Sequence, residues 1–100
     1  MKRGDVWTVE RFGHERSVVI VGNDATIGDQ NGVLVVPLSD VLEPKVGMPG
    51  LNDSNGTPLG TFLFYRVGSI DKKSLRSRTA VLGDASRHFA DVALRAAFDI

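Results

Sequence analysis

The chain alternates short apolar segments with turn-forming segments, at the spacing that is typical of β-strands. Residues 5–10 are rich in β-branched and aromatic side chains, which favour a strand. Residues 17–21 and 33–38 are apolar at consecutive positions, so both faces of each segment are expected to be buried, as in the central strands of a sheet. Residues 61–67 are predicted to form a fourth strand, and residues 79–82 a short fifth one.

Glycine, proline and asparagine separate these segments. Gly13 is predicted to turn the chain between the first two strands, and residues 25–32 to form a loop. Residues 43–60 are predicted to be the longest loop, with a turn at Asn55-Gly56. Residues 70–75 are predicted to form a helical turn that is capped by Asp71.

The last segment has the period of a helix, for which Asp84 is the predicted N-cap. Apolar residues recur after it at helical spacing and are expected to form one buried stripe: Ala85, Phe89, Val92, Ala93 and Ala96. Strands in series followed by one helix predict a mainly β fold, in which a small, twisted and partly closed antiparallel sheet carries a C-terminal α-helix.

Composition indicates a single domain and argues against metal and cofactor sites. A chain of 100 residues suffices for one domain, which we expect to span 1–100. It has no cysteine and two histidines, so we expect no metal and no cofactor. The first residues are charged rather than apolar, and the apolar runs are far shorter than the ~20 residues of a membrane span. We therefore expect a cytoplasmic protein with no membrane partner.

Charge argues against a broad nucleic-acid surface but allows a narrow one. Twelve basic and 12 acidic residues give a formal net charge of zero, which counts against an extended duplex footprint. The cations are clustered, however, and four lie within the first sixteen residues: Lys2, Arg3, Arg11 and Arg16. Such a local cluster suits a short single strand of RNA.

The strongest candidate for chemistry is the run Gly13-His14-Glu15-Arg16, directly before an apolar strand. A guanidinium is always charged and forks onto two oxygens, so Arg16 suits a phosphate group. His14 can give or accept a proton near neutral pH, and Glu15 can act as a base or orient His14. The alternative interpretation is a solvated loop in which Arg16 forms a weak ion pair with Glu15.

Four segments in this order resemble the MazF/PemK family of toxins. The opening Lys2-Arg3-Gly4-Asp5-Val6-Trp7 is similar to the start of the family's first strand, and residues 13–16 are similar to the loop that follows it. Residues 33–39, VLVVPLS, look like the family's third strand, and residues 68–75, GSIDKKSL, look like a later turn. This resemblance covers nearly the whole chain and implies an SH3-like barrel.

The resemblance implies a toxin of a type II toxin–antitoxin system. Such toxins are homodimeric endoribonucleases that cut single-stranded RNA without metal, leaving 2′,3′-cyclic phosphate and 5′-hydroxyl ends, and an acidic antitoxin similar to MazE or PemI blocks them. By position, Arg16 matches the catalytic arginine, Ser39 matches the Ser/Thr after the third strand, and His14 and Glu15 match the loop's His and Glu. RNA contacts are expected from Arg3, Arg11, Arg16, Asn23, Tyr65 and Arg66.

Two alternatives remain at this stage. Poisons of DNA gyrase similar to CcdB share the fold, but they lack the catalytic arginine and end in Trp-Gly-Ile, whereas this chain has Arg16 and Phe98-Asp99-Ile100. The other alternative is an inactive homologue that only binds its antitoxin. The loop at residues 13–16 is shorter than in the family, and no acidic residue stands at or next to Tyr65, where one branch has one. The sequence therefore leaves open which residue acts as acid and which as base.

Overall fold

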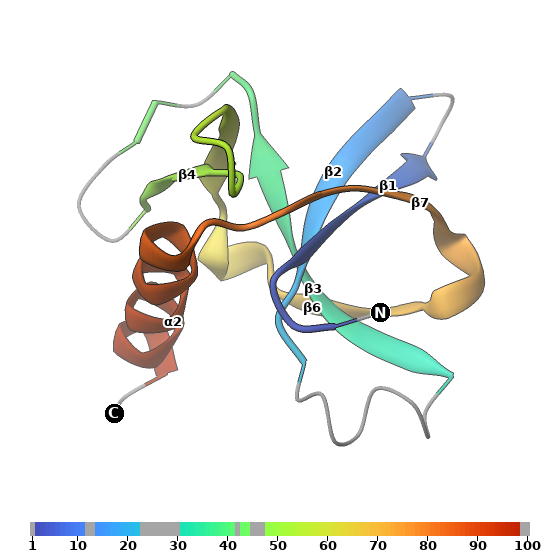
Figure 1. Ribbon diagram of the computed structural model, residues 1–100. Coiled ribbons are helices and arrows are strands. Elements are labelled where there is room, and N and C mark those ends of the chain that lie inside the picture. Colours follow the sequence, from blue (N-terminus) through green and yellow to red (C-terminus); the bar gives the residue numbers. More distant parts are fainter. Residues whose placement is uncertain (1, 12–13, 23–30, 42, 45–47, 99–100) are drawn as a thin grey trace.

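Antiparallel strands form one strongly curled sheet, and a helix packs against it (Figure 1). The computed structural model describes residues 2–11, 14–22, 31–41, 43–44 and 48–98. The elements are β1 (Asp5–Arg11), β2 (His14–Ile20), β3 (Gly32–Ser39), β4 (Gly50–Asn52), β5 (Pro58–Phe62), the 3-10 turn η1 (Phe64–Arg66), β6 (Gly68–Asp71), the 3-10 turn η2 (Lys72–Ser74), β7 (Leu75–Val81) and α2 (Asp84–Phe98). The predicted mainly β fold with a C-terminal helix is confirmed.

β3 joins the two parts of this sheet. The strand order is β4-β5-β3-β2-β1-β7, and β6 also pairs with β3. β3 pairs with β2 as far as Pro37, which lies opposite Val18. Beyond Pro37, Leu38 and Ser39 pair with β5 instead. The first residues of β2 therefore have β1 as a paired neighbour but not β3.

Both faces of the second half of β2 and of β3 carry buried residues, as the consecutive apolar residues predicted, although Leu34 is 48% exposed. Successive side chains of a strand point to opposite faces. On the face toward α2, one cluster contains Val6, Val19, Val36, Leu38, Leu51, Phe62, Leu82, Ala90 and Ala93. On the other face, a second cluster contains Val18, Ile20, Val33, Val35 and Leu75, with Trp7 packed against it. Each fully buried aliphatic side chain contributes about 1.5–3 kcal/mol relative to an exposed one.

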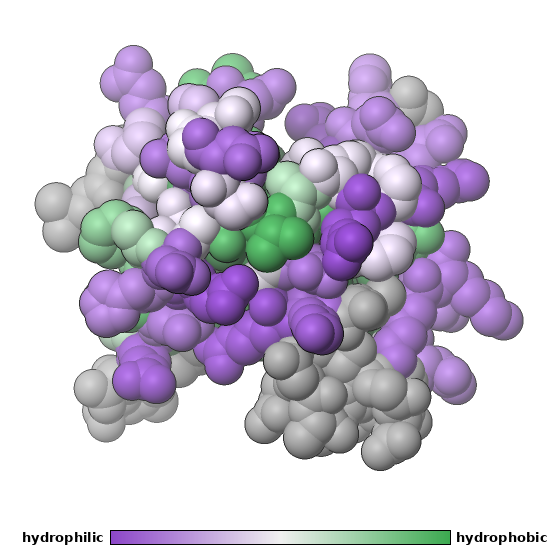
Figure 2. Space-filling view, viewed as in Figure 1, coloured by the Kyte–Doolittle hydropathy of each residue, from purple (hydrophilic) through white to green (hydrophobic). Residues whose placement is uncertain are grey.

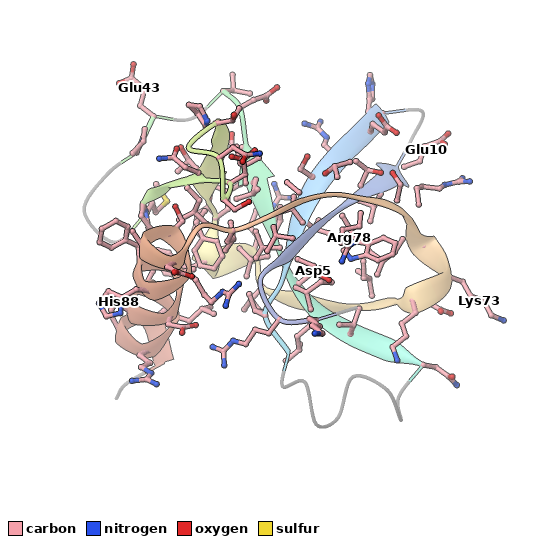
Figure 3. The ribbon with its side chains drawn as sticks, viewed as in Figure 1. Asp5, Glu10, Glu43, Lys73, Arg78 and His88 are labelled. Atoms are coloured by element: carbon pink, nitrogen blue, oxygen red, sulfur yellow. The ribbon has the colours of Figure 1, made fainter. Side chains whose placement is uncertain are left out.

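The start of the chain is fixed by a buried carboxylate. Asp5 is 4% exposed, and its carboxylate accepts a hydrogen bond of 2.9 Å from the backbone N–H of Lys2. A guanidinium nitrogen of Arg78, on the neighbouring β7, lies 4.0 Å from the same carboxylate oxygen (Figure 3). A buried charge needs such partners, so Asp5 has a structural explanation.

Several predicted boundaries are wrong. β2 begins at His14, three residues before the expected start, so residues 14–16 belong to a strand and not to a loop. The expected strand over residues 61–67 ends at Phe62, and η1 follows it. The expected long loop over residues 43–60 contains β4 and the start of β5. β7 begins at Leu75 rather than at residue 79.

The helix begins where it was expected, but it buries a different face. Arg87 donates its backbone N–H to the carbonyl of Gly83, so Gly83 occupies the cap position and Asp84 lies in the first turn. The buried residues are Ser86, Ala90 and Ala93, of which only Ala93 belongs to the predicted stripe. The other stripe residues are exposed: Ala85, Phe89, Val92 and Ala96. Small residues allow the helix to lie close to β4, where the Ser86 hydroxyl accepts a hydrogen bond from the backbone N–H of Asn52.

Two predicted turns are present, but the first is shorter than predicted. The carboxylate of Asp71 accepts a hydrogen bond from the backbone N–H of Lys73 and caps η2, which covers only Lys72–Ser74. Residues 70 and 71 belong instead to β6, a strand that the sequence did not predict, and Leu75 begins β7. Gly56 has a φ of 84° in the turn after Asn55, a conformation that favours glycine. The expected turn at Gly13 and residues 25–30 of the expected loop lie outside the described residues. In the part of the chain that the structure describes, no helix is long and apolar enough to cross a membrane.

Candidate active site

The three residues of the predicted site lie on the first half of β2, in a hairpin with β1. Arg16 pairs with Val9, Glu15 with Glu10, and His14 with Arg11. All three site residues are exposed, whereas the second half of the same strand is buried. A strand holds its side chains in more restricted positions than a loop does, so the correction from loop to strand makes this a more rigid site.

A cavity of about 200 Å³ opens beside Arg16 and Glu15. Its lining is completed by side chains from β2, β3 and β5 and by the residue after β3: Ser17, Leu38, Leu59 and Asp40. The cavity exists because β3 leaves β2 at Pro37 to pair with β5, which separates the end of β3 from the start of β2. If the register of β2 and β3 continued past Pro37, Arg16 would lie opposite Ser39.

The charge of Arg16 is not neutralised by a close carboxylate. The ion pairs between described residues include Arg3–Asp91, Arg76–Glu10 and Arg78–Asp5, and none between described residues involves Arg16. The alternative interpretation, a surface ion pair of Arg16 with Glu15, is therefore wrong, because no carboxylate oxygen of Glu15 lies within 4.0 Å of a guanidinium nitrogen of Arg16. The guanidinium remains available to an anion that enters the cavity.

Ser39 lies in a neighbouring cavity rather than in the first one. Its hydroxyl accepts a hydrogen bond of 3.2 Å from the backbone N–H of Val41. The second cavity has a volume of about 340 Å³, and its lining comes from the end of β3, from β4 and from β5: Ser39, Asp40, Pro44, Gly50, Leu51, Asn52, Pro58, Gly60 and Thr61. Asp40 is common to both linings, so the two cavities adjoin at this residue.

Asp40 is a site residue that sequence reasoning missed. It follows Ser39 directly, and the pair Ser39-Asp40 looks like an ordinary strand end. The structure instead places Asp40 at the point where β3 has left β2, facing the cavity of Arg16. Its position next to a candidate phosphate-contacting serine was the one available signal.

Of the remaining predicted residues, those whose side chains the structure describes do not line these two cavities. Arg3 forms an ion pair of 2.6 Å with Asp91 on α2. Tyr65 and Arg66 lie exposed on η1, and neither lines either of the two cavities. His14 starts β2 but is absent from both linings, Arg11 is described only by its place at the end of β1, and Asn23 lies outside the described residues.

The second histidine is remote from the site. His88 lies on α2, and its side chain points away from the sheet (Figure 3).

Hydrophilic side chains cover most of the face seen in Figure 2, and apolar surface is confined to small patches there. Among the residues that the structure describes, no group of three or more His, Asp or Glu side chains could hold a metal ion.

Comparisons with known proteins show which solved structures share this fold. The sequence matches no protein-family model and no curated protein. Among solved structures, the chain is similar to a mycobacterial endoribonuclease in complex with its cognate antitoxin, with a TM-score of 0.88 and 18% identity over 100% of this chain and 96% of that one. It is also similar to MazF in a MazE–MazF complex from Deinococcus radiodurans, with a TM-score of 0.83 and 16% identity over 100% and 96%. The Mycobacterium tuberculosis toxin MazF-mt6 follows with a TM-score of 0.79 and 14% identity over 96% and 97%.

These structures match the chain over almost its whole length, although few residues are identical. Low identity with a high TM-score shows shared architecture and leaves the activity to be argued from the site. The chain has the fold of the MazF endoribonuclease toxins.

Proposed function

We propose that this protein is the toxin of a type II toxin–antitoxin system and cleaves single-stranded RNA without a metal ion. The observation that carries the proposal is the Arg16 guanidinium, which has no carboxylate of the described chain within 4.0 Å and lines a cavity together with Glu15 and Asp40. The likeness to MazF endoribonucleases supports it.

In the proposed reaction the substrate supplies its own nucleophile. A carboxylate, for which Glu15 is the candidate, takes the proton of the ribose 2′-hydroxyl, and the 2′-oxygen forms a bond to phosphorus. The bond from phosphorus to the 5′-oxygen breaks, and an acid, for which His14 is the candidate, protonates that oxygen. Arg16 stabilises the negative charge that builds up on the phosphoryl oxygens. The products carry a 2′,3′-cyclic phosphate and a 5′-hydroxyl.

The experiment that tests this chemistry uses matched RNAs. Purified protein is incubated with an RNA of mixed sequence in excess chelator, and the ends of the products are identified by mass spectrometry. Cleavage should persist, and an RNA with a 2′-deoxy sugar at the cut should resist. Cleavage of the 2′-deoxy substrate, or loss of cleavage in chelator, would contradict the proposal. Inhibition of DNA gyrase by a protein that cuts no RNA would favour the CcdB-like alternative.

The RNA strand is proposed to extend beyond the cavity. Arg11 ends β1 beside the start of β2, so it lies on the same hairpin as Arg16. Arg3, Tyr65 and Arg66 remain proposed RNA contacts outside the two cavities, and Asn23 remains a proposed contact outside the described residues. Charge removal at Arg3 or Arg66 should weaken RNA binding and leave the chemical step unchanged.

An acidic antitoxin is the proposed protein partner. Toxins of this fold have been solved together with cognate antitoxins. For this chain, we propose that an acidic, disordered peptide orders on the surface around Arg11 and Arg16 and competes with RNA. A cognate antitoxin that binds without reducing RNA cleavage would show that the peptide uses another surface.

The proposed homodimer has a candidate contact surface on α2. Ala85, Phe89, Val92 and Ala96 lie three or four residues apart, so they share one face of the helix, and all are exposed. Phe89 is 52% exposed and Val92 51%, which is unusual for large apolar side chains on a helix that already buries another face. We propose that a second copy of the chain covers this stripe.

Light scattering tests the dimer. The wild-type protein at micromolar concentration should have close to twice the mass of the 10.8 kDa chain. Phe89→Asp should shift it to the monomer, because a charge in an apolar interface loses its hydration. His88→Asp, next to it on the same helix, is the matched control and should remain dimeric. A monomeric wild-type protein at every concentration would refute the proposal.

A further inference from the structure

The second cavity, next to the Arg16 cavity, has the features of a site for a flat ring. Pro44, Leu51 and Pro58 contribute apolar surface to a volume of about 340 Å³. Gly60 contributes backbone only, and its φ of 130° favours glycine. A Cβ at Gly60 would lie 2.7 Å from the carbonyl oxygen of Ser39, so a side chain cannot be accommodated there without moving the strand. The wall therefore depends on the absence of a side chain.

Two polar side chains of this cavity are not engaged elsewhere in the described chain. The backbone of Asn52 is held by α2, since its N–H donates to the Ser86 hydroxyl and its carbonyl accepts from the N–H of Gly83. Its side-chain amide makes no hydrogen bond to the described residues, and neither does the carboxylate of Asp40. Ser39 and Thr61, by contrast, have partners. The cavity thus combines a carboxylate and an amide with apolar walls.

We propose that this cavity binds one base of the RNA strand whose phosphate contacts Arg16, and that Asp40 and Asn52 select a base with an exocyclic amino group, which uracil lacks. This inference rests on the proposed function. A carboxylate only accepts hydrogen bonds, and it pairs well with the exocyclic amino group of cytosine, while an asparagine amide pairs well with the amino group and ring nitrogen of adenine. Guanine also carries an amino group, next to a ring N–H, and a carboxylate can accept from both. Uracil has no amino group and carries a carbonyl oxygen on each side of its ring N–H, so Asp40 repels it.

Asp40 is negatively charged and lies beside the proposed phosphate site, so its position needs an explanation. A carboxylate beside a phosphate-binding arginine opposes binding of the phosphate, since both are anionic. Asp40 lines both cavities, so its carboxylate can face the neighbouring base while Arg16 faces the phosphate. The same residue therefore separates the subsite for the phosphate from the subsite for the base.

Binding of single nucleotides tests the base site without any cleavage. The full chain, labelled with ¹⁵N, is titrated with AMP, CMP, GMP and UMP, and with ribose 5-phosphate as the control for the phosphate alone. AMP, CMP or GMP should shift the side-chain amide signals of Asn52 and the backbone amide signal of Gly60, at lower concentration than UMP. The inference is overturned if no nucleotide shifts these signals, if ribose 5-phosphate shifts them equally, or if UMP binds as tightly as the other three.

Cleavage preference then tests Asp40 and Asn52 separately from the activity itself. RNAs that differ in one base next to the cut are compared with each variant, so a general change in rate cancels. Asp40→Asn and Asn52→Ala should each reduce the preference for amino-bearing bases over uracil by roughly tenfold. Asp84→Asn and Asn55→Ala, on exposed positions outside both cavities, are the controls and should keep it. An unchanged preference in both variants overturns the inference while the proposed function stands. Nucleotide binding at Asn52 without cleavage of any RNA leaves the base site standing and refutes the proposed activity.

Discussion

The two halves of β2 differ sharply in burial and in pairing. His14, Glu15 and Arg16 are exposed, whereas Val18, Val19 and Ile20 are 5%, 1% and 0% exposed. Both halves pair with β1, but only the second half also pairs with β3. The candidate active site therefore lies where β2 is paired on one side only, with β1. The residues of β2 that belong to the core lie where the strand is paired with both β1 and β3.

This arrangement lets one strand serve stability and chemistry with little conflict. The exposed half buries little surface, so a change there removes little of the free energy of folding. The buried half contributes to both core clusters, because Val19 faces α2 and Ile20 faces the opposite side. Substitutions along β2 should therefore separate into those that alter stability and those that alter activity.

The largest expected effect on folding comes from Ile20→Ala. Ile20 is 0% exposed, and removing its side chain leaves a cavity between strands that cannot collapse. We expect a loss of about 2–5 kcal/mol in the free energy of unfolding, measured by urea denaturation. Ile20→Val should cost only about 0.5–1.5 kcal/mol. An Ile20→Ala protein as stable as the wild type would contradict the division of the strand.

Glu15→Gln is expected to lower the rate of cleavage and to leave the free energy of unfolding unchanged. If Glu15 is the base, the loss should be at least about 100-fold in kcat, the lower end for general acid–base catalysis. Glu10 lies directly opposite on β1, is also exposed and is not part of the cavity lining. Glu10→Gln is therefore the matched control, and single-turnover cleavage should be unchanged in it. Equal losses in both variants would point to a general effect of charge.

The smallest effect is expected from His14→Ala. His14 lies on the same hairpin as Glu15 but does not line the cavity. If another group or water can protonate the leaving oxygen, we expect a loss of roughly tenfold or less in kcat, below the usual range for an essential acid. A pH–rate profile measures this, and a loss similar to that of Glu15→Gln would show that His14 enters the site when RNA binds.

The sequence predicted the buried half of β2 and missed the start of the strand for the same reason. Consecutive valines and an isoleucine indicate a strand that is buried on both faces. His14, Glu15 and Arg16 carry no such signal, because an exposed strand half is paired through its backbone and not through its side chains. The sequence therefore predicts a loop at residues 13–16, whereas β2 begins at His14.

Tertiary packing accounts for two further misses, the buried face of α2 and the position of Asp40. The stripe with Phe89 and Val92 has the stronger apolar character, yet the helix buries Ser86 and Ala90, whose small size lets it approach β4. Asp40 enters the site because β3 changes its partner from β2 to β5, and a single sequence contains no signal for that exchange.

The central claim is that Arg16 stabilises the charge of RNA cleavage without supporting the fold. The most direct measurement compares Arg16→Ala with wild type in single-turnover cleavage and in thermal unfolding, with the exposed Arg95→Ala on α2 as the control. We predict a loss of about 100- to 1,000-fold in the rate of cleavage, as for removal of one preorganised donor, and an unchanged melting temperature. Full activity in a folded Arg16→Ala protein would contradict this account.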